Sequence, residues 1–319
     1  MKAAVYQSPG APQVLRYIDV ADPTCSTDGV LIKVEAVSIE GGDLINRASS
    51  PPPDPGGIVG YAAAGEVIAV GSDVRDRFVG QKVTSFDMHG SHAALRAVAA
   101  SRTWVIPDGL SVDAAAALPI SFGTAHHCLF PRGQLAEGET VFVQGGAGGV
   151  GAAAIQLASS NGAEVIATVS GAERIAKLKD LGLTHAIDHR QTNVHDTLMH
   201  LTDSRGADLV IDPIGSTLRT SLSVLRPGGR LVFVGNAGRS SLEVDLWPAL
   251  QANQTLIGVF MGTELNKPDV HASVAHMLKR AAAGELEVLI DRTFSLANVA
   301  DAHAYAENNS VLGRVILRP

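Results

Sequence analysis

The chain has 319 residues, of which 46% are hydrophobic and 18% charged, and its formal net charge is −7. This composition indicates a folded α/β protein long enough for two domains, and the acidic balance argues against a general nucleic-acid binder. The sequence contains no apolar run long enough to cross a bilayer and no signal peptide at its start, so we expect no membrane partner and a cytoplasmic location.

The first hundred or so residues contain short β-type runs separated by Gly and Pro, and residues 30–37 and 64–70 are the clearest examples. This spacing predicts a compact, mostly antiparallel, barrel-like domain. Residues 313–319 also read as a strand, and we expect this strand to return to the first domain.

From Val141 the chain alternates between strand and helix patterns. This rhythm predicts a parallel, doubly wound sheet, with a further edge strand at 255–260 and a helix at 270–283. The candidate strands are 141–143, 164–169, 185–187, 209–211 and 230–234, and the candidate helices are 152–160, 172–181, 194–203 and 216–225.

The most specific motif lies where the first of these strands meets its helix. Three glycines there fit G-x-G-x-x-G, the turn that lets a backbone approach a pyrophosphate. The helix N-terminus adds N–H groups and a partial positive charge. The pattern alone is weak in a chain with 33 glycines, but its strand-and-helix context predicts dinucleotide binding. The residues of this turn are Gly146, Ala147, Gly148, Gly149, Val150 and Gly151.

Further motifs are spread along the chain at 9–15, 114–119, 145–158, 226–232, 290–294 and 313–315. Together they resemble the zinc-independent quinone oxidoreductases of the medium-chain dehydrogenase/reductase superfamily (zeta-crystallin-like). The resemblance covers nearly the whole chain. It implies an α/β protein with a GroES-like β-barrel domain at 1–120 and 265–319, which carries the substrate site, and a Rossmann dinucleotide-binding domain at 121–264.

Zinc-dependent relatives in this superfamily carry a Gly-His-Glu element, which appears here as Gly60-Tyr61-Ala62. The chain has only two cysteines, Cys25 and Cys128, and none of its 11 histidines shows the spacing of a metal site. Because zinc needs three or four ligands, we expect no metal.

NADPH is the expected cofactor. An NAD-preferring site usually ends its second strand with a carboxylate, whereas this strand ends at Ser170 and Arg174 follows in the next helix. A hydroxyl and a cation suit a 2′-phosphate, although a helix cap and a solvated charge are the alternative interpretations. The resemblance aligns the family's Tyr and C-terminal Arg of this site with His189 and Asn309, and Arg190 is a candidate substitute.

The resemblance also places the nicotinamide between the two domains. Asp212, in the turn after the preceding strand, either lines this site or only caps its own turn. Loop residues that follow the carboxyl ends of strands bind ligands in open α/β sheets. The residues expected around the ring are Thr124, Gly235, Asn236, Ala237 and Phe260.

The stretch 38–47 matches the family loop that forms the floor of the substrate site. It keeps Asp43, but Glu40 and Ile45 replace the family's Asn and Tyr. Asp43 and Glu40 are candidate catalytic residues, and loop ordering is the alternative role for Asp43. His92, where relatives often have Tyr, is a candidate proton donor or a structural histidine. The proline-rich stretch 49–57 is hypothesised to gate the pocket.

These features predict a zinc-free oxidoreductase that transfers hydride from NADPH to a quinone or an α,β-unsaturated carbonyl. One alternative is a reductase of another activated alkene, such as a haloacrylate, a nitroalkene or an enoyl thioester. The other is an NADPH-binding protein without significant turnover. The resemblance implies a homodimer in which edge strands near 255–260 pair.

Overall fold

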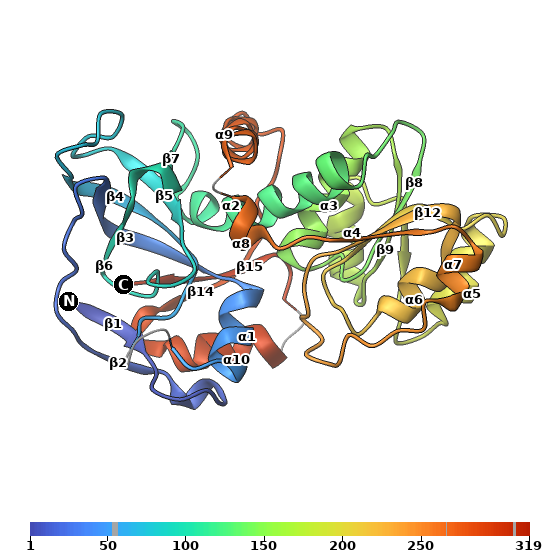
Figure 1. Cartoon of the computed structure of the whole chain (residues 1–319), viewed down its shortest axis with the longest axis horizontal. Coiled ribbons are helices and arrows are strands. Elements are labelled where there is room, and N and C mark those ends of the chain that lie inside the picture. The colour runs from blue at the N-terminus through green and yellow to red at the C-terminus, as the bar shows by residue number, and fades with distance from the viewer. Residues whose placement is uncertain (53–56, 266, 309–310) are drawn as a thin grey trace. The chain divides into compact units, whose positions relative to one another are not determined.

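A computed structural model describes residues 1–52, 57–265, 267–308 and 311–319. The chain forms two compact units, the barrel unit (Met1–Gly123 with Gly262–Pro319) and the Rossmann unit (Thr124–Met261), which Figure 1 shows. The barrel unit is thus discontinuous in sequence, and the Rossmann unit is a single stretch between its two parts.

The barrel unit is built on a seven-stranded sheet in the order β14-β15-β3-β4-β5-β7, with β6 also paired to β3. All neighbouring strands are antiparallel except β14 and β15. A separate ribbon pairs β1 with β2. The strands are β1 (Lys2–Val5), β2 (Arg16–Asp19), β3 (Gly29–Ile39), β4 (Ala62–Val70), β5 (Lys82–Phe86), β6 (Leu95–Ala99), β7 (Thr103–Val105), β14 (Ile290–Ser295) and β15 (Arg314–Arg318).

The predicted return of the final strand is confirmed, because β15 pairs with β3 and places Leu317 opposite Val37. Both ends of the chain also share one core, in which buried Tyr6 and Leu15 belong to the same cluster as Leu317. The helices that lie in or enter this unit are α1 (Gly41–Ser49), α2 (Val112–His127), α8 (Met261–Glu264), α9 (Pro268–Ala282) and α10 (Val299–Asn308).

One prediction for this unit is wrong. The stretch 38–47 is not a loop, because β3 runs to Ile39 and helix α1 begins at Gly41. The helix starts on a Gly-Gly pair, which has low intrinsic helix propensity. Buried contacts of Asp43 and Arg47 hold it in place despite this start.

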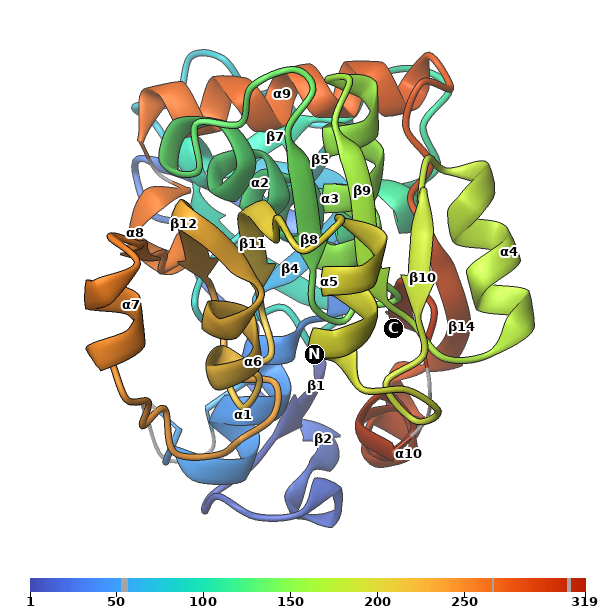
Figure 2. The ribbon, with the colours of Figure 1, turned by 90° about the vertical axis from the view of Figure 1, so that its right-hand side faces the viewer.

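The Rossmann unit has a six-stranded parallel sheet in the order β10-β9-β8-β11-β12-β13, so the predicted doubly wound sheet is confirmed. Figure 2 shows β12, β11, β8, β9 and β10 in this order, with α5 and α6 on the near side and α3 behind. The elements are β8 (Thr140–Val143), α3 (Gly149–Ser160), β9 (Glu164–Thr168), α4 (Ala172–Asp180), β10 (His185–Ile187), α5 (Val194–Leu201), β11 (Ala207–Asp212), α6 (Leu218–Ser223), β12 (Leu225–Phe233), α7 (Trp247–Gln251) and β13 (Thr255–Gly258).

The central strands of this sheet are buried on both faces, as continuous apolar runs predict for a parallel sheet. Every residue of β8 and β11 is buried. On one face, Phe142 and Val210 pack with Leu198 of α5 and Leu222 of α6 in a single core cluster. The strand order reverses between β8 and β11, and ligands bind beyond the carboxyl ends of strands at such a point.

Candidate active site

The glycine turn links β8 to α3, and two of its glycines, Gly146 and Gly151, are packed too closely for a side chain. A Cβ on Gly151 would lie 2.3 Å from Gly145 O, and one on Gly146 would lie 2.8 Å from Ala167 Cβ. Gly148 is the N-cap of α3, and the first-turn N–H groups of that helix have no partner of their own in the helix. The turn therefore presents backbone donors without side chains, which is what an approaching pyrophosphate requires.

A chain of hydrogen bonds behind the turn joins the ends of three strands. The Thr168 hydroxyl accepts from Gly145 N at 2.7 Å and donates to Gln144 Oε1 at 3.1 Å. Gln144 Nε2 in turn donates to Ser221 Oγ at 3.3 Å, and Ser221 donates to Asp212 Oδ2 at 2.7 Å. The sequence analysis missed Thr168 and Gln144, which stand at the ends of their strands as polar residues in otherwise apolar runs.

The expected phosphate site lies at the ends of β9 and β10. Ser170 Oγ donates to Asp188 Oδ1 at 2.5 Å and lies 3.5 Å from His189 Nδ1. The guanidinium of Arg174 covers Gly171, because an ideal Cβ there would be 3.2 Å from Arg174 Nη2. The structure thus brings Ser170, Arg174 and His189 into one neighbourhood.

Asp188 is a member of this group that the sequence analysis missed. The hydrogen bond from Ser170, followed by those from the Arg190 backbone and the Gln191 side chain, lowers the pKa of Asp188. The carboxylate is therefore ionised at neutral pH. A negative charge here opposes a 2′-phosphate, while Arg174 favours it.

The loops after β11 and β12 lie side by side. Ala237 N donates to Pro213 O at 3.3 Å, and Asn236 Nδ2 donates to Ser240 O at 3.0 Å. Asp212 is fully buried and accepts from Ile214 N, Gly215 N and two hydroxyl groups. These contacts favour the turn-capping role for Asp212.

The remaining residues expected near the nicotinamide lie on other elements of the Rossmann unit. Thr124 is buried within α2, and Gly235 follows β12 closely. Phe260 comes two residues after β13 and is 62% exposed.

In the barrel unit, Glu40 and Asp43 are both buried at the start of α1. Glu40 accepts from Ser38 Oγ at 2.7 Å and forms an ion pair with Arg314 at 2.5 Å. Asp43 Oδ2 accepts from Glu40 N at 2.8 Å and so caps the helix. Burial raises the pKa of Glu40, and it raises the pKa of Asp43 well above its ordinary value. This geometry favours a structural role for both carboxyl groups, in which they hold the start of α1 in place.

His92 is fully buried beneath Gly60. Its Nδ1 lies 3.0 Å from Ser91 Oγ, and its Nε2 lies 3.1 Å from His303 Nε2. Burial, with a smaller contribution from Arg96, lowers the pKa of His92 to about 3. A neutral ring with both nitrogens in hydrogen bonds favours the structural role of this histidine.

Tyr61 is the polar group of this unit that the sequence analysis considered only as a lost zinc ligand. It immediately precedes β4, and its Oη accepts a hydrogen bond from Asn46 Nδ2 of α1 at 2.8 Å. Two of the predictions fall partly or wholly outside the described residues. These are the Asn309 position and the proline-rich gate, of which residues 53–56 are not described.

Two protein families match this architecture. Residues 26–109 match the family described as alcohol dehydrogenase GroES-like domain, and residues 149–280 match the family described as zinc-binding dehydrogenase. The quinone oxidoreductase of Pseudomonas aeruginosa is 30% identical over 316 residues, which are 97% of this chain and 97% of that protein. The chain belongs to the quinone oxidoreductase family. It is an oxidoreductase of the medium-chain dehydrogenase/reductase superfamily, of the zeta-crystallin-like kind.

Other members of the superfamily differ in what they act on. The 2-haloacrylate reductase of a Burkholderia species is 28% identical over 331 residues, which are 99% of this chain and 98% of that protein. A mycobacterial protein solved in complex with NADPH superposes with a TM-score of 0.94 at 29% identity, with all of both chains covered. Relatives that match nearly the whole chain are thus named for different substrates, a quinone and a 2-haloacrylate.

Over residues 1–52, 57–265, 267–308 and 311–319, no three His, Cys, Asp or Glu side chains are grouped as a metal site would require. No helix in the same residues is both long and apolar enough to span a membrane.

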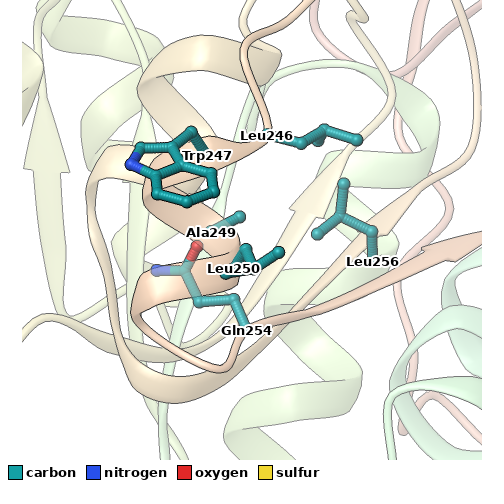
Figure 3. Close-up of a pocket in the computed structure, with 6 residues that line it drawn as sticks. All are labelled: Leu246, Trp247, Ala249, Leu250, Gln254 and Leu256. Atoms are coloured by element: carbon teal, nitrogen blue, oxygen red, sulfur yellow. The ribbon is translucent and has the colours of Figure 1, made fainter.

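An apolar hollow lies at the edge of the Rossmann sheet, away from the glycine turn in sequence (Figure 3). It is formed by α7, the segments that flank it and the edge strand β13. Trp247 is 63% exposed and Leu250 66% exposed, so this face carries large apolar side chains in contact with solvent. The lining residues are Leu246, Trp247, Ala249, Leu250, Gln254 and Leu256.

Proposed function

We propose that the protein transfers a hydride from NADPH to a quinone or an α,β-unsaturated carbonyl. The observation that carries this proposal is the glycine turn between β8 and α3, where a Cβ at Gly151 would collide with backbone at 2.3 Å. Such a turn serves to bring backbone N–H groups against a dinucleotide pyrophosphate. Family membership supports oxidoreductase chemistry, and the NADPH complex of the mycobacterial protein supports the choice of cofactor.

The phosphate site fits NADPH with one exception. Ser170 and Arg174 offer a hydroxyl and a cation, and His189 adds a ring nitrogen beside them. Asp188 is the exception, because its charge reduces the preference for a 2′-phosphate over a 2′-hydroxyl. We therefore expect the preference for NADPH over NADH to be weaker than it would be if Ser170 and Arg174 were the only groups at this site.

When bound, the reduced nicotinamide supplies a hydride, and the chain supplies placement. The loops 213–215 and 235–238 stand beyond the carboxyl ends of β11 and β12, where we propose that Asn236 and Ala237 position the ring. Thr124 and Phe260 complete the proposed set. In the barrel unit, Glu40 and Asp43 hold α1, which carries the proposed substrate floor.

A second candidate is the reduction of another activated alkene. Two departures from the family pattern favour it, Glu40 for Asn and Ile45 for Tyr, because each changes the hydrogen-bonding groups of α1. The 2-haloacrylate reductase relative is consistent with it. All of these substrates accept the hydride in the same way, so the shape and polarity of the substrate site decide which of them is reduced.

The test is the rate of NADPH loss, with NADH in parallel, against quinones, enones and other activated alkenes. Saturable turnover of quinones or enones with NADPH faster than NADH is expected. Turnover confined to 2-haloacrylates, nitroalkenes or enoyl thioesters would replace the first candidate with the second. NADPH binding without turnover on any of them would contradict both and favour a binding protein.

We also propose that the chain forms a homodimer through the β13 edge. The strand order ends at β13, and the exposed Trp247 and Leu250 lie beside it. Sedimentation should give a mass near twice 33.1 kDa. The double variant Trp247→Ser and Leu250→Ser should shift it to the monomer. Phe78→Ser, at a 62% exposed residue of the barrel unit, is the matched control and should stay dimeric.

A further inference from the structure

One phenol group of the barrel unit has a hydrogen-bond donor that the described residues leave unused. Tyr61 Oη accepts from Asn46 Nδ2 at 2.8 Å, and this contact fixes the direction of the phenol oxygen. Over the part of the chain that the structure describes, the Tyr61 hydroxyl has no acceptor for its own proton. A hydroxyl group whose oxygen accepts one hydrogen bond, and whose proton has no acceptor, is fixed in direction and can still donate that proton to a ligand in a hydrogen bond.

The Tyr61 ring is also held by its packing. A Cβ on Gly42 would lie 2.3 Å from Tyr61 Cε2, so the ring rests against the bare backbone of the second residue of α1. On another side, Phe86 meets the ring edge-to-face at 6.1 Å. The side chain is nevertheless only half-buried, so its hydroxyl remains reachable. Fixed orientation together with access is what a group that binds a reacting atom requires.

The surroundings keep this phenol protonated. Burial, followed by the nearby charge of Asp43, raises the pKa of Tyr61 to about 12. The group is therefore a hydrogen-bond donor throughout the neutral and mildly alkaline range.

We propose that Tyr61 is a catalytic residue that donates a hydrogen bond to the carbonyl oxygen of the substrate, with Asn46 as its positioning residue. This inference rests on the proposed function. The hydride adds to the carbon β to the carbonyl, and the electron pair of the C=C bond moves so that the oxygen gains the negative charge. A solvent proton then adds to the α-carbon. Tyr61 keeps its proton throughout and stabilises the charge on the oxygen.

Tyr61→Phe is the decisive variant, and Tyr6→Phe is its matched control. Tyr6 is buried in the same unit and donates to Ser50 O at 3.1 Å, so its variant loses a hydroxyl whose proton is already used within the chain. For an enone, we expect Tyr61→Phe to lower kcat by about 30- to 100-fold, somewhat less than the loss of a fully enclosed oxyanion donor. NADPH affinity should stay unchanged, and Tyr6→Phe should keep the wild-type kcat. A kcat for Tyr61→Phe within twofold of wild type would overturn the proposal.

A second measurement does not depend on turnover. The infrared C=O stretch of a bound saturated ketone, recorded with NADPH present, should be lower in wild type and Tyr6→Phe than in Tyr61→Phe. Asn46→Ala should give an intermediate value, since the phenol remains but loses its orienting partner. Equal frequencies in wild type and Tyr61→Phe would contradict the donor role. If wild type turns over no quinone or enone, the proposed function fails, and this frequency difference still decides whether Tyr61 binds a carbonyl oxygen.

Discussion

Asp188 in the Rossmann unit and Asp43 in the barrel unit both belong to proposed ligand sites, but their surroundings differ. Asp188 is partly exposed, receives hydrogen bonds from Ser170 and Gln191, and has a lowered pKa. Asp43 is fully buried, caps α1 through Glu40 N, and has a raised pKa. We propose that the partly exposed carboxylate acts on a ligand through its charge, whereas the buried one acts on the chain through its hydrogen bond.

The two regions also present their ligand groups differently. At the glycine turn the donors are backbone N–H groups, and the absence of side chains is the requirement. Beside α1 the proposed donor is the side chain of Tyr61, and the bare Gly42 makes room for its ring. We therefore propose that glycine serves contact with a ligand in one unit and contact with a side chain in the other.

The largest effect is expected from Gly151→Ala. The new Cβ would lie 2.3 Å from Gly145 O and 2.7 Å from Gly146 Cα, and neither backbone atom can rotate away. The turn must open, and NADPH affinity should fall by about a hundredfold or more, near 3 kcal/mol. Titration calorimetry measures this loss.

The matched control is Gly41→Ala, where a Cβ meets nothing within 4 Å. It should bind NADPH like wild type. If Gly151→Ala bound NADPH within threefold of wild type, the glycine turn would not be the pyrophosphate site.

A smaller effect is expected from Asp188→Asn. The amide keeps an acceptor for Ser170 but removes the negative charge. The ratio of kcat/KM for NADPH to kcat/KM for NADH should therefore rise about tenfold. This is the size of effect expected when one unit charge is removed a few ångströms from a partly solvated phosphate. Arg174→Gln should lower the same ratio. Unchanged ratios in both variants would remove the Ser170 neighbourhood from the cofactor site.

The smallest effect is expected from Asp43→Asn, and it depends on pH. Because the pKa of Asp43 is raised on folding, the folded state binds the proton more tightly, and the wild type gains stability as pH falls through that pKa toward the unfolded value near 4. Asn keeps the acceptor for Glu40 N without the charge. At pH 8 the variant should melt about 2–4 °C higher, with the gap closing toward pH 4.

Asp208→Asn tests the opposite sign. Although burial alone would raise its pKa, hydrogen bonds from Thr140 N, Arg226 and Arg205 leave the pKa of Asp208 lowered. Its stabilisation is present above the unfolded pKa and is lost as pH falls through the folded one, so this variant should melt lower at pH 8. Equal shifts for Asp43→Asn and Asp208→Asn would contradict the contrast between the two kinds of carboxylate.

The alternation of strands and helices in the Rossmann unit was predictable because it depends on local periodicity, and the glycine turn because its spacing is local too. Helix α1 was not, since its Gly-Gly start opposes helix formation and its stability comes from distant partners such as Arg314. A sequence pattern does not reveal such long-range compensation.

The missed site residues have the same explanation. Asp188 reaches Ser170 only because β10 pairs with β9, with Ile187 opposite Thr168. The predicted doubly wound sheet could have revealed Asp188, because in such a sheet the end of the strand before Asp188 lies beside the end of the strand before Ser170. Tyr61 had no comparable signal, because its contact with Asn46 joins residues 15 positions apart through packing against Gly42.

The position of β15 beside β3 bears on how the molecule assembles during its synthesis. The Rossmann unit is one continuous stretch, Thr124–Met261, and all of its strands are synthesised before β14 and β15. The barrel unit must wait for Val315 and Leu317 to close the core that it shares with Tyr6 and Leu15. A nascent chain therefore carries a completed nucleotide-binding half while β3 still exposes an unpaired edge, which is the form most in need of a chaperone.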